Sequence, residues 1–353
     1  MKIRTLYFPF IFLVSNAVFA QPHLGSKPSI KQLSAGSNHS LALLNNGSLW
    51  AWGNNAAGQL GDSSTTDQDH PVWIRQETNW ASATAGDGFN HAIKTDGTLW
   101  GWGINKIGQL GIPTNNLKYM YTVPVQIGND HDWQMVSSGN YFTVGLKKDG
   151  TIWVWGADIS YLLSDKTHQY EPIKINDKNN NDFKDIATGD EFFMAMKKDG
   201  TIWTMGTINE QNNKQLVKVN DDTDWAMMDA GRQHAAAIKN DGTLWTWGAN
   251  ESGQLGNGTT NKSKEPVRVG ENFAAVGAAN NYTAAVKKFE GDVFWWGKNW
   301  MNKTSQLLPI HAQVTTSYAP FATGHNSMLL LMDSTGILEF CKYDKYFTLK
   351  RIK

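Results

Sequence analysis

Residues 224–256, DWAMMDAGRQHAAAIKNDGTLWTWGANESGQLG, contain a pattern that recurs along almost the whole chain of 353 residues. The glycine just before the tryptophans, Gly242 in this stretch, marks each copy of the pattern. Seven such glycines occur, 42 to 53 residues apart: Gly47, Gly97, Gly150, Gly200, Gly242, Gly291 and Gly336. A period of this length is typical of solenoids, repeat arrays and β-propellers.

Each unit begins with a short segment that ends in glycine or alanine. An aromatic or apolar residue precedes that small residue by six positions in every unit, as Trp225 precedes Gly231. Between them the side chains are mostly small, as in segment 83–85 before Gly86. Small side chains suit a strand close to a central axis, where bulky groups would collide. We therefore expect this segment to form the innermost strand of each unit.

The middle of each unit predicts a β-hairpin. In the quoted stretch an apolar run, 235–238, leads through Asp241-Gly242 into Thr-Leu-Trp-x-Trp-Gly. Two runs joined through Asn-Gly or Asp-Gly favour a type I′ turn, which needs positive φ at both central residues. Tryptophans two residues apart, such as Trp245 and Trp247, point to the same face of a strand. The alternate positions are also mostly apolar, which predicts that both faces are buried.

A polar loop and an edge strand complete each unit. The loop carries Gly-Gln-Leu-Gly at residues 58–61, 108–111 and 253–256, and segments such as Pro-Val-Arg-Val at 266–269 follow it. Proline is tolerated at the start of an edge strand, because no ladder hydrogen bond is lost there. Four strands in each unit predict an all-β fold, a seven-bladed β-propeller of four-stranded antiparallel blades. We expect contiguous blades with residues 346–352 in the last outer strand; a swapped strand at the closure is the alternative.

These motifs resemble the regulator-of-chromosome-condensation (RCC1) repeat family, over roughly residues 30 to 353. The resemblance rests on Asp-Gly-x-Leu-Trp-x-Trp-Gly-x-Asn followed by Gly-Gln-Leu-Gly, and it is most specific in the first, second and fifth units. The third unit has Tyr161-Leu162-Leu163-Ser164 in place of Gly-Gln-Leu-Gly. The fourth unit lacks that element, and the sixth keeps only Ser305-Gln306-Leu307. The resemblance implies a propeller, here of a secreted bacterial type.

Residues 1–20 stand outside the repeats and have the features of a secretory signal peptide. Lys2 and Arg4 precede the apolar run 6–14, and Val18-Phe19-Ala20 offers a cleavage site before Gln21. The run is far shorter than the ~20 residues that span a bilayer. We therefore expect residues 1–20 to be removed and residues 21–353 to form one propeller domain. The mature protein is expected to be an exported monomer, periplasmic or secreted, without a membrane span.

The sequence contains no recognisable motif for catalysis, metal binding or phosphate binding. The formal net charge is zero and no strongly basic block occurs, so we expect no nucleic-acid partner. His39 and His234 occupy a repeat position that holds phenylalanine in other units, which predicts packing rather than catalysis. Residues 177–182 lack the glycine and the final glutamate of a calcium loop, so we expect a solvated loop. No enzymatic activity, cofactor or metal site is predicted.

Two residues after the innermost strand change in size and charge between units, while their neighbours keep a fixed pattern. The resemblance implies that this loop faces a protein partner, as in the family's nuclear nucleotide-exchange factor and secreted β-lactamase inhibitors. It implies aromatic anchors and charge complementarity at this loop. The predicted partner-binding residues are Tyr141, Asp190, Glu191, Arg232, Gln233, Asn281 and Tyr282. The alternative is that they are ordinary polar loop residues.

Three functions are compatible with the sequence. The first is an exported, non-enzymatic protein-binding module, inhibitory or scaffolding, whose channel-side loops contact an unidentified protein. The second is a guanine-nucleotide exchange factor that acts on a host small GTPase; the degenerate third and fourth units weigh against it. The third is an envelope or matrix component that assembles with other exported proteins. The variable loop favours the first.

Overall fold

A computed structural model describes residues 30–113, 118–157, 168–175, 177–208, 211–289, 291–298, 304–315, 321–323, 327–333, 336–341 and 350–352. Every regular element in these residues is a β-strand. The predicted signal peptide, residues 1–20, and the start of the mature chain lie outside the described residues. Among the described residues, no helix is long and apolar enough to cross a membrane.

The described strands form seven four-stranded sheets, which we call blades 1 to 7 in chain order. Blades 1 and 2 comprise β1 (Ile30–Ala35), β2 (His39–Leu44), β3 (Leu49–Gly53), β4 (Gln68–Trp73), β5 (Trp80–Ala85), β6 (Phe89–Lys94), β7 (Leu99–Ile104) and β8 (Met120–Ile127). Blades 3 and 4 comprise β9 (Trp133–Ser138), β10 (Phe142–Lys147), β11 (Ile152–Ala157), β12 (His168–Lys174), β13 (Phe183–Thr188), β14 (Phe192–Lys197), β15 (Ile202–Ile208) and β16 (Gln211–Lys218).

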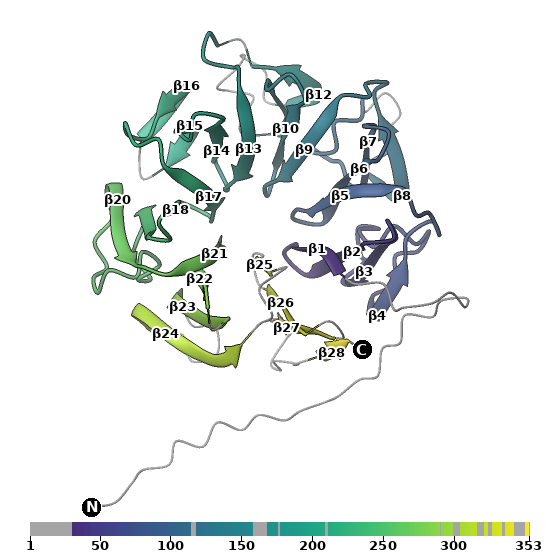
Figure 1. Ribbon diagram of the computed structural model, residues 1–353. Helices are drawn as coiled ribbons and strands as arrows, with labels where there is room; N and C mark the ends of the chain where they lie inside the picture. Colours follow the sequence, from purple (N-terminus) through teal and green to yellow (C-terminus); the bar gives the residue numbers. More distant parts are fainter. Residues whose placement is uncertain are drawn as a thin grey trace, which may run out of the picture.

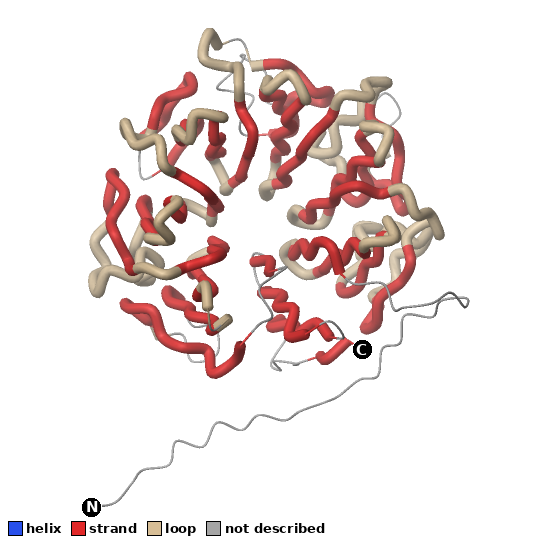
Figure 2. The backbone as a smooth tube through the Cα atoms, viewed as in Figure 1, coloured by secondary structure: helices blue, strands red, loops and turns tan. Residues whose placement is uncertain are grey.

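The remaining strands complete the ring. Blades 5 and 6 comprise β17 (Trp225–Ala230), β18 (His234–Lys239), β19 (Leu244–Gly248), β20 (Ser263–Gly270), β21 (Phe273–Ala278), β22 (Tyr282–Lys287), β23 (Asp292–Lys298) and β24 (Ser305–Thr315). Blade 7 comprises β25 (Phe321–Thr323), β26 (Ser327–Asp333), β27 (Gly336–Cys341) and β28 (Lys350–Ile352). The blades surround a central opening, with the first strand of each blade innermost (Figures 1 and 2). The predicted all-β propeller with four-stranded antiparallel blades is confirmed.

Each blade is contiguous in sequence. Four consecutive strands pair in order within every sheet, so no strand is exchanged between blades among the described strands. The ring closes where β1 lies against β25 and β26 (Figure 1). Residues 350–352 pair with β27 as the outer strand of blade 7, as expected for the end of the tail. Residues 342–349 and Lys353 lie outside the described residues.

The innermost strands are crowded, which explains their small side chains. A Cβ atom on Gly139, the residue that follows β9, would lie 2.8 Å from the carbonyl oxygen of Gly189 in the next blade. Real Cβ atoms do not approach a backbone oxygen so closely, and the strand ends could not meet if a side chain were present. The predicted crowding around the axis is therefore confirmed.

The hydrophobic core lies between neighbouring blades. One cluster joins Phe142 and Val144 of blade 3 to Phe183 and Phe193 of blade 4. The second tryptophan of the third strand is fully buried in blades 2 and 3, as Trp155 shows. Both faces of these strands are buried, as predicted, because each sheet is stacked between two others.

The hairpin turn differs from the predicted type I′ turn. Only Gly242 has a positive φ, 83°, whereas a type I′ turn would also require a positive φ at Asp241. The Gly242 amide donates to the carbonyl of Lys239 at 2.8 Å, and this bond closes a turn that ends on the left-handed glycine. Oδ1 of Asp241 accepts bonds from the amide of Thr243 (2.8 Å) and from its hydroxyl (2.7 Å). The carboxylate thus stabilises a turn that the dipeptide alone does not identify.

The Gly-Gln-Leu-Gly loops connect neighbouring blades. The indole nitrogen Nε1 of Trp102 in blade 2 donates to the carbonyl of Gln59 in blade 1 at 2.9 Å. Trp296 in blade 6 donates to the carbonyl of Gln254 in blade 5 at the same distance. We call this contact the interblade latch. It uses the buried tryptophan of one unit and a main-chain oxygen of the preceding unit.

Candidate partner-binding face

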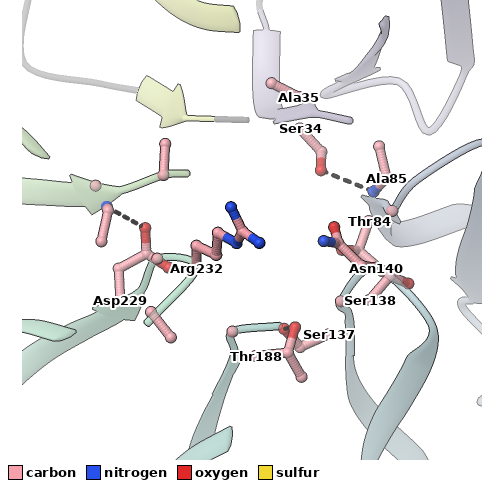
Figure 3. A pocket seen from close by; sticks show the side chains of 18 of the residues that line it. Ser34, Ala35, Thr84, Ala85, Ser137, Ser138, Asn140, Thr188, Asp229 and Arg232 are labelled. Carbon is pink, nitrogen blue, oxygen red and sulfur yellow. Dashed lines mark hydrogen bonds between the residues drawn. The ribbon is translucent and has the colours of Figure 1, made fainter. Parts of the chain in front are cut away.

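A cavity of about 370 Å³ lies on the ring axis. The cavity is lined by the innermost strands of blades 1 to 6, which are β1, β5, β9, β13, β17 and β21, and by the loops that follow them (Figure 3). We call these the cavity-side loops; each joins the first and second strands of a blade. Because strands alternate in direction, the loops between third and fourth strands lie at the same end of the ring. One end of the propeller therefore carries both sets of loops.

Many polar groups of the cavity wall hold the blades together. The hydroxyl of Ser34 in blade 1 accepts a hydrogen bond from the amide of Ala85 in blade 2 at 2.9 Å (Figure 3). Oδ2 of Asp229 in blade 5 accepts one from the amide of Ala278 in blade 6 at 2.7 Å (Figure 3). The two acceptors occupy the same repeat position, so the wall repeats one interblade contact with different side chains.

Three consecutive cavity-side loops are joined by Asn140, Asp190 and Arg232, which we call the rim cluster. Nδ2 of Asn140 in blade 3 donates to Oδ1 of Asp190 in blade 4 at 2.7 Å. Nε of Arg232 in blade 5 lies 2.9 Å from Oδ2 of the same carboxylate. Asn140 and Arg232 both point into the cavity (Figure 3). Two residues predicted to contact a partner, Asp190 and Arg232, therefore also form an ion pair with each other.

The carboxyl group of Asp190 titrates at an unusual pH. Burial raises the pKa of Asp190 to about 6, with Arg232 opposing the shift and with Glu191 and Asp87 adding to it. The pKa of Asp185, which also lines the cavity, is raised to about 6, chiefly by burial. The charge of the cavity wall therefore changes between about pH 5 and pH 7.

The predicted residues Tyr141, Glu191 and Gln233 occupy one exposed position in three successive loops. Tyr141 keeps 46% of its surface exposed. The carbonyl of each residue accepts a hydrogen bond from the end of the third strand of its own blade, at 2.9, 2.7 and 2.8 Å respectively. The side chains are thus exposed while their backbone is fixed. Asn281, at the same position in blade 6, is half-buried and has the same backbone contact, at 2.8 Å.

The prediction of an exposed anchor at Tyr282 is wrong. Its side chain is 1% exposed, because Tyr282 is the first residue of β22 and points into the core. Phe89, Phe142 and Phe192 begin the second strands of other blades and are buried in the same way. Tyr282 is therefore a packing residue, and the exposed loop ends at Asn281.

The two histidines at this position, His39 and His234, are core residues, as predicted. Nε2 of His39 lies 2.6 Å from Oδ1 of Asn90, and Nε2 of His234 lies 2.9 Å from the hydroxyl of Thr283, both in the next blade. Burial lowers the pKa of His39 to about 4 and that of His234 to about 3. Both rings are neutral at pH 7 and serve interblade packing.

Sequence reasoning missed several residues of the site. Asp185 and Asp229 were not recognised as cavity-lining, although both lie on innermost strands. Asn140 was not among the predicted partner-binding residues, and its contact with Asp190 spans 50 residues of sequence. These residues could have been found from the sequence, because they are polar side chains in innermost strands and loops that otherwise carry small residues.

The part of the chain that the structure describes contains no group of three or more histidine, cysteine, aspartate or glutamate residues arranged to hold a metal ion. The loop at residues 177–182 is anchored rather than wholly solvated. Asn180 is buried, and its side chain bonds to the amide and the carbonyl of Ile152 at 2.7 and 3.1 Å. This loop therefore supports β11.

The comparisons with known proteins agree with the geometry. A model of the regulator of chromosome condensation (RCC1) repeat matches residues 46–93, 96–146 and 241–286, and a second model of this repeat matches residues 30–59 and 136–159. The curated proteins searched contain no match to this sequence.

Several solved structures share the fold. The structure of Prp20p from Saccharomyces cerevisiae, described with its binding to Gsp1p and histones, is 18% identical, with a TM-score of 0.71 over 84% of this chain and 80% of that chain. A structure of Kap60 bound to yeast RCC1 (Prp20) matches with 14% identity and a TM-score of 0.74 over 97% and 91% of the two chains. Human WBSCR16 is 20% identical, with a TM-score of 0.65 over 73% and 72%. At these identities the likeness concerns the fold alone.

Proposed function

We propose, from the premise that this chain is built of RCC1 repeats, that the protein is a protein-binding module without enzymatic activity. Its binding face is the end of the seven-bladed ring that carries the cavity-side loops. The observation that carries the proposal is the exposure of Tyr141, Glu191 and Gln233 on a fixed backbone beside the rim cluster. The residues that follow them, Phe142, Phe192 and His234, are buried, whereas these three are exposed and differ between units.

The arrangement has the properties of an efficient recognition surface. A tyrosine supplies a large contact area with few rotatable bonds, and charged neighbours select partners by complementarity. A fixed backbone reduces the conformational entropy lost on binding. Prp20p, which has the same fold, is described as binding proteins. That likeness supports the use of such a ring for binding and does not identify the partner.

Export is part of the proposal. The charged start, the apolar run 6–14 and the small residue before Gln21 support cleavage after Ala20 and a mature protein in the periplasm or medium. Mass spectrometry of the protein recovered from a bacterial host measures this directly. We expect the mass of a polypeptide that begins at Gln21. A full-length protein recovered from the cytoplasm would contradict export.

A binding experiment with matched variants tests the face. Mature protein, residues 21–353, carries a photo-crosslinking amino acid either at position 141 or at position 289. Phe289 lies in the turn between β22 and β23, at the opposite end of the ring, and is 82% exposed. We expect one envelope or culture protein to crosslink from position 141 and not from position 289, and to be lost with Glu191→Lys. Equal crosslinking from both positions contradicts the proposed face.

The second candidate, guanine-nucleotide exchange, is retained because the structure of yeast RCC1 (Prp20) matches over 97% of this chain. The measurement is the release of a fluorescent guanine nucleotide from a purified small GTPase. Acceleration by the mature protein would replace the non-enzymatic proposal. An unchanged rate is expected.

A further inference from the structure

One carboxylate connects three blades at the mouth of the cavity. Asp190 uses Oδ1 to accept a bond from Asn140 in blade 3 and Oδ2 to pair with Arg232 in blade 5. The main chain also links the loops of blades 4 and 5, because the Asp190 amide donates to the carbonyl of Arg232 at 3.1 Å. The backbones of these two loops are thus held together independently of the carboxylate. A change in the charge of Asp190 therefore acts on the side chains and leaves the loops in place.

The ion pair is asymmetric in its exposure. The side chain of Asp190 is 16% exposed, whereas that of Arg232 is 51% exposed and points into the cavity (Figure 3). A guanidinium that already faces water is readily rehydrated when the pair separates, and this hydration offsets most of the lost attraction. The buried carboxyl, in contrast, is more stable without its charge when the cation is absent. Separation of the pair on protonation of Asp190 therefore carries a small penalty.

The ionisable surroundings of Asp190 are mostly acidic. The groups on its own loop, on neighbouring cavity-side loops and on the innermost strands are Asp87, Asp185, Glu191, Asp229 and Arg232. Arg232 is the one cation in the described lining of the cavity. Burial raises the pKa of Asp190 to about 6, so its carboxyl group is protonated at a higher pH than an exposed aspartate. Arg232 opposes this shift, and Glu191 and Asp87 add to it by smaller amounts.

Resting on the proposed binding function, we propose that Asp190 is a proton-operated clasp for Arg232, and that its protonation releases the guanidinium into the cavity mouth. Above about pH 7 the carboxylate holds Arg232 through Nε. Below about pH 5 the neutral acid no longer attracts the cation, and the binding face presents a free guanidinium. A partner with an acidic group at this position is then bound more tightly at pH 5 than at pH 7.

The arginine content of the chain makes the clasp directly measurable. Residues 21–353 contain four arginines, Arg75, Arg232, Arg268 and Arg351. Labelling with ¹⁵N-arginine gives at most four Nε–H signals in a two-dimensional NMR spectrum. We expect the Arg232 signal to shift between pH 4.5 and pH 8 with a midpoint near pH 6. We expect the shift to vanish in Asp190→Asn, while the signal of Arg268, which pairs with Glu271 at 2.7 Å, is the same in both proteins.

A second variant keeps the test decisive if Asp190→Asn does not fold. The negative charge of the exposed Glu191 contributes to the raised pKa of Asp190. Glu191→Gln is therefore expected to move the midpoint of the Arg232 signal to lower pH. An Arg232 signal that is constant from pH 5 to pH 7.5, that still titrates in folded Asp190→Asn, or whose midpoint is unchanged by Glu191→Gln overturns the clasp.

The titration uses the protein without a partner, so it separates the clasp from the proposed function. A titrating Arg232 together with no crosslinked partner at position 141 retains the clasp and rejects the binding face. A constant Arg232 signal together with a specific partner at position 141 rejects the clasp and retains the binding face.

Discussion

Replacement of Trp102 by alanine tests whether the buried tryptophan of each third strand provides the cohesion of the ring. The side chain is fully buried, and its ring centroid lies 6.3 Å from that of Trp80. A tryptophan buries ~150–250 Å², which corresponds to about 4–6 kcal/mol at ~25 cal/mol per Å². Measured losses for such truncations in protein cores are about 3–5 kcal/mol, because the cavity collapses in part.

The interblade latch adds a smaller contribution. Trp102→Ala removes the bond from Nε1 to the carbonyl of Gln59, about 1 kcal/mol net. The carbonyl is not left without a partner, because Nδ2 of Asn90 still donates to it at 2.6 Å. We therefore expect a total loss of about 4–5 kcal/mol in the free energy of unfolding. Trp102→Phe, which keeps most of the ring and loses the latch, should cost about 1–2 kcal/mol.

The assay is urea-induced unfolding of mature protein, followed by far-ultraviolet circular dichroism so that tryptophan removal does not alter the probe. Trp245→Ala is the matched control, since this ring is half-buried and bonds within its own hairpin to the hydroxyl of Thr243 at 2.9 Å. It should cost about 1–2 kcal/mol. The assignment of the core is refuted if the free energy of unfolding of Trp102→Ala lies within about 1 kcal/mol of that of the parent. It is also refuted if the two alanine variants are equally destabilised.

Three further predictions follow from the turns and the cavity. Gly242→Val should lose about 2–3 kcal/mol in urea unfolding, because valine resists a φ of 83°, and stability equal to the parent would contradict the left-handed glycine. Asp241→Ala should lose about 1–2 kcal/mol with its two bonds to Thr243, whereas Asp241→Asn should retain most of the stability; equal losses would contradict the role of the side-chain acceptor. Because the pKa of Asp185 is raised to about 6 on folding, ionisation of this carboxyl group costs stability as pH rises from about 4 to 6; Asp185→Asn should therefore gain stability relative to the parent across this range and be about 1–3 kcal/mol more stable than the parent at pH 8, and a stability difference between the two proteins that does not change with pH would disprove the raised pKa.

The strands could be predicted from the sequence because their signals are local and repeated. The offset between Trp225 and Gly231, and the spacing of Trp245 and Trp247, each define a strand and its face within a few residues. The turn type was not predictable from Asp-Gly alone, because Oδ1 of Asp241 bonds to Thr243 one residue beyond that dipeptide.

The candidate site could be predicted only in part. The exposed positions Tyr141 and Glu191 follow from their place in a variable loop. Tyr282 was misplaced because it was assigned to the loop, whereas β22 begins at this residue, as β10 begins at Phe142; a shift of one residue moves a side chain from solvent to core. The contact between Asp190 and Arg232 depends on the angle between blades, which no local pattern encodes.

Contiguous blades without strand exchange have a consequence for the order of the chain. Since each sheet is complete within one unit, no strand is shared across the junction between blades 7 and 1, where β1 lies against β25 and β26. Circular permutants cut between β20 and β21, or between β8 and β9, and rejoined at the natural ends would therefore keep every sheet whole. The ring has no structurally required first blade, and genetic rearrangement can begin the polypeptide at any interblade connection.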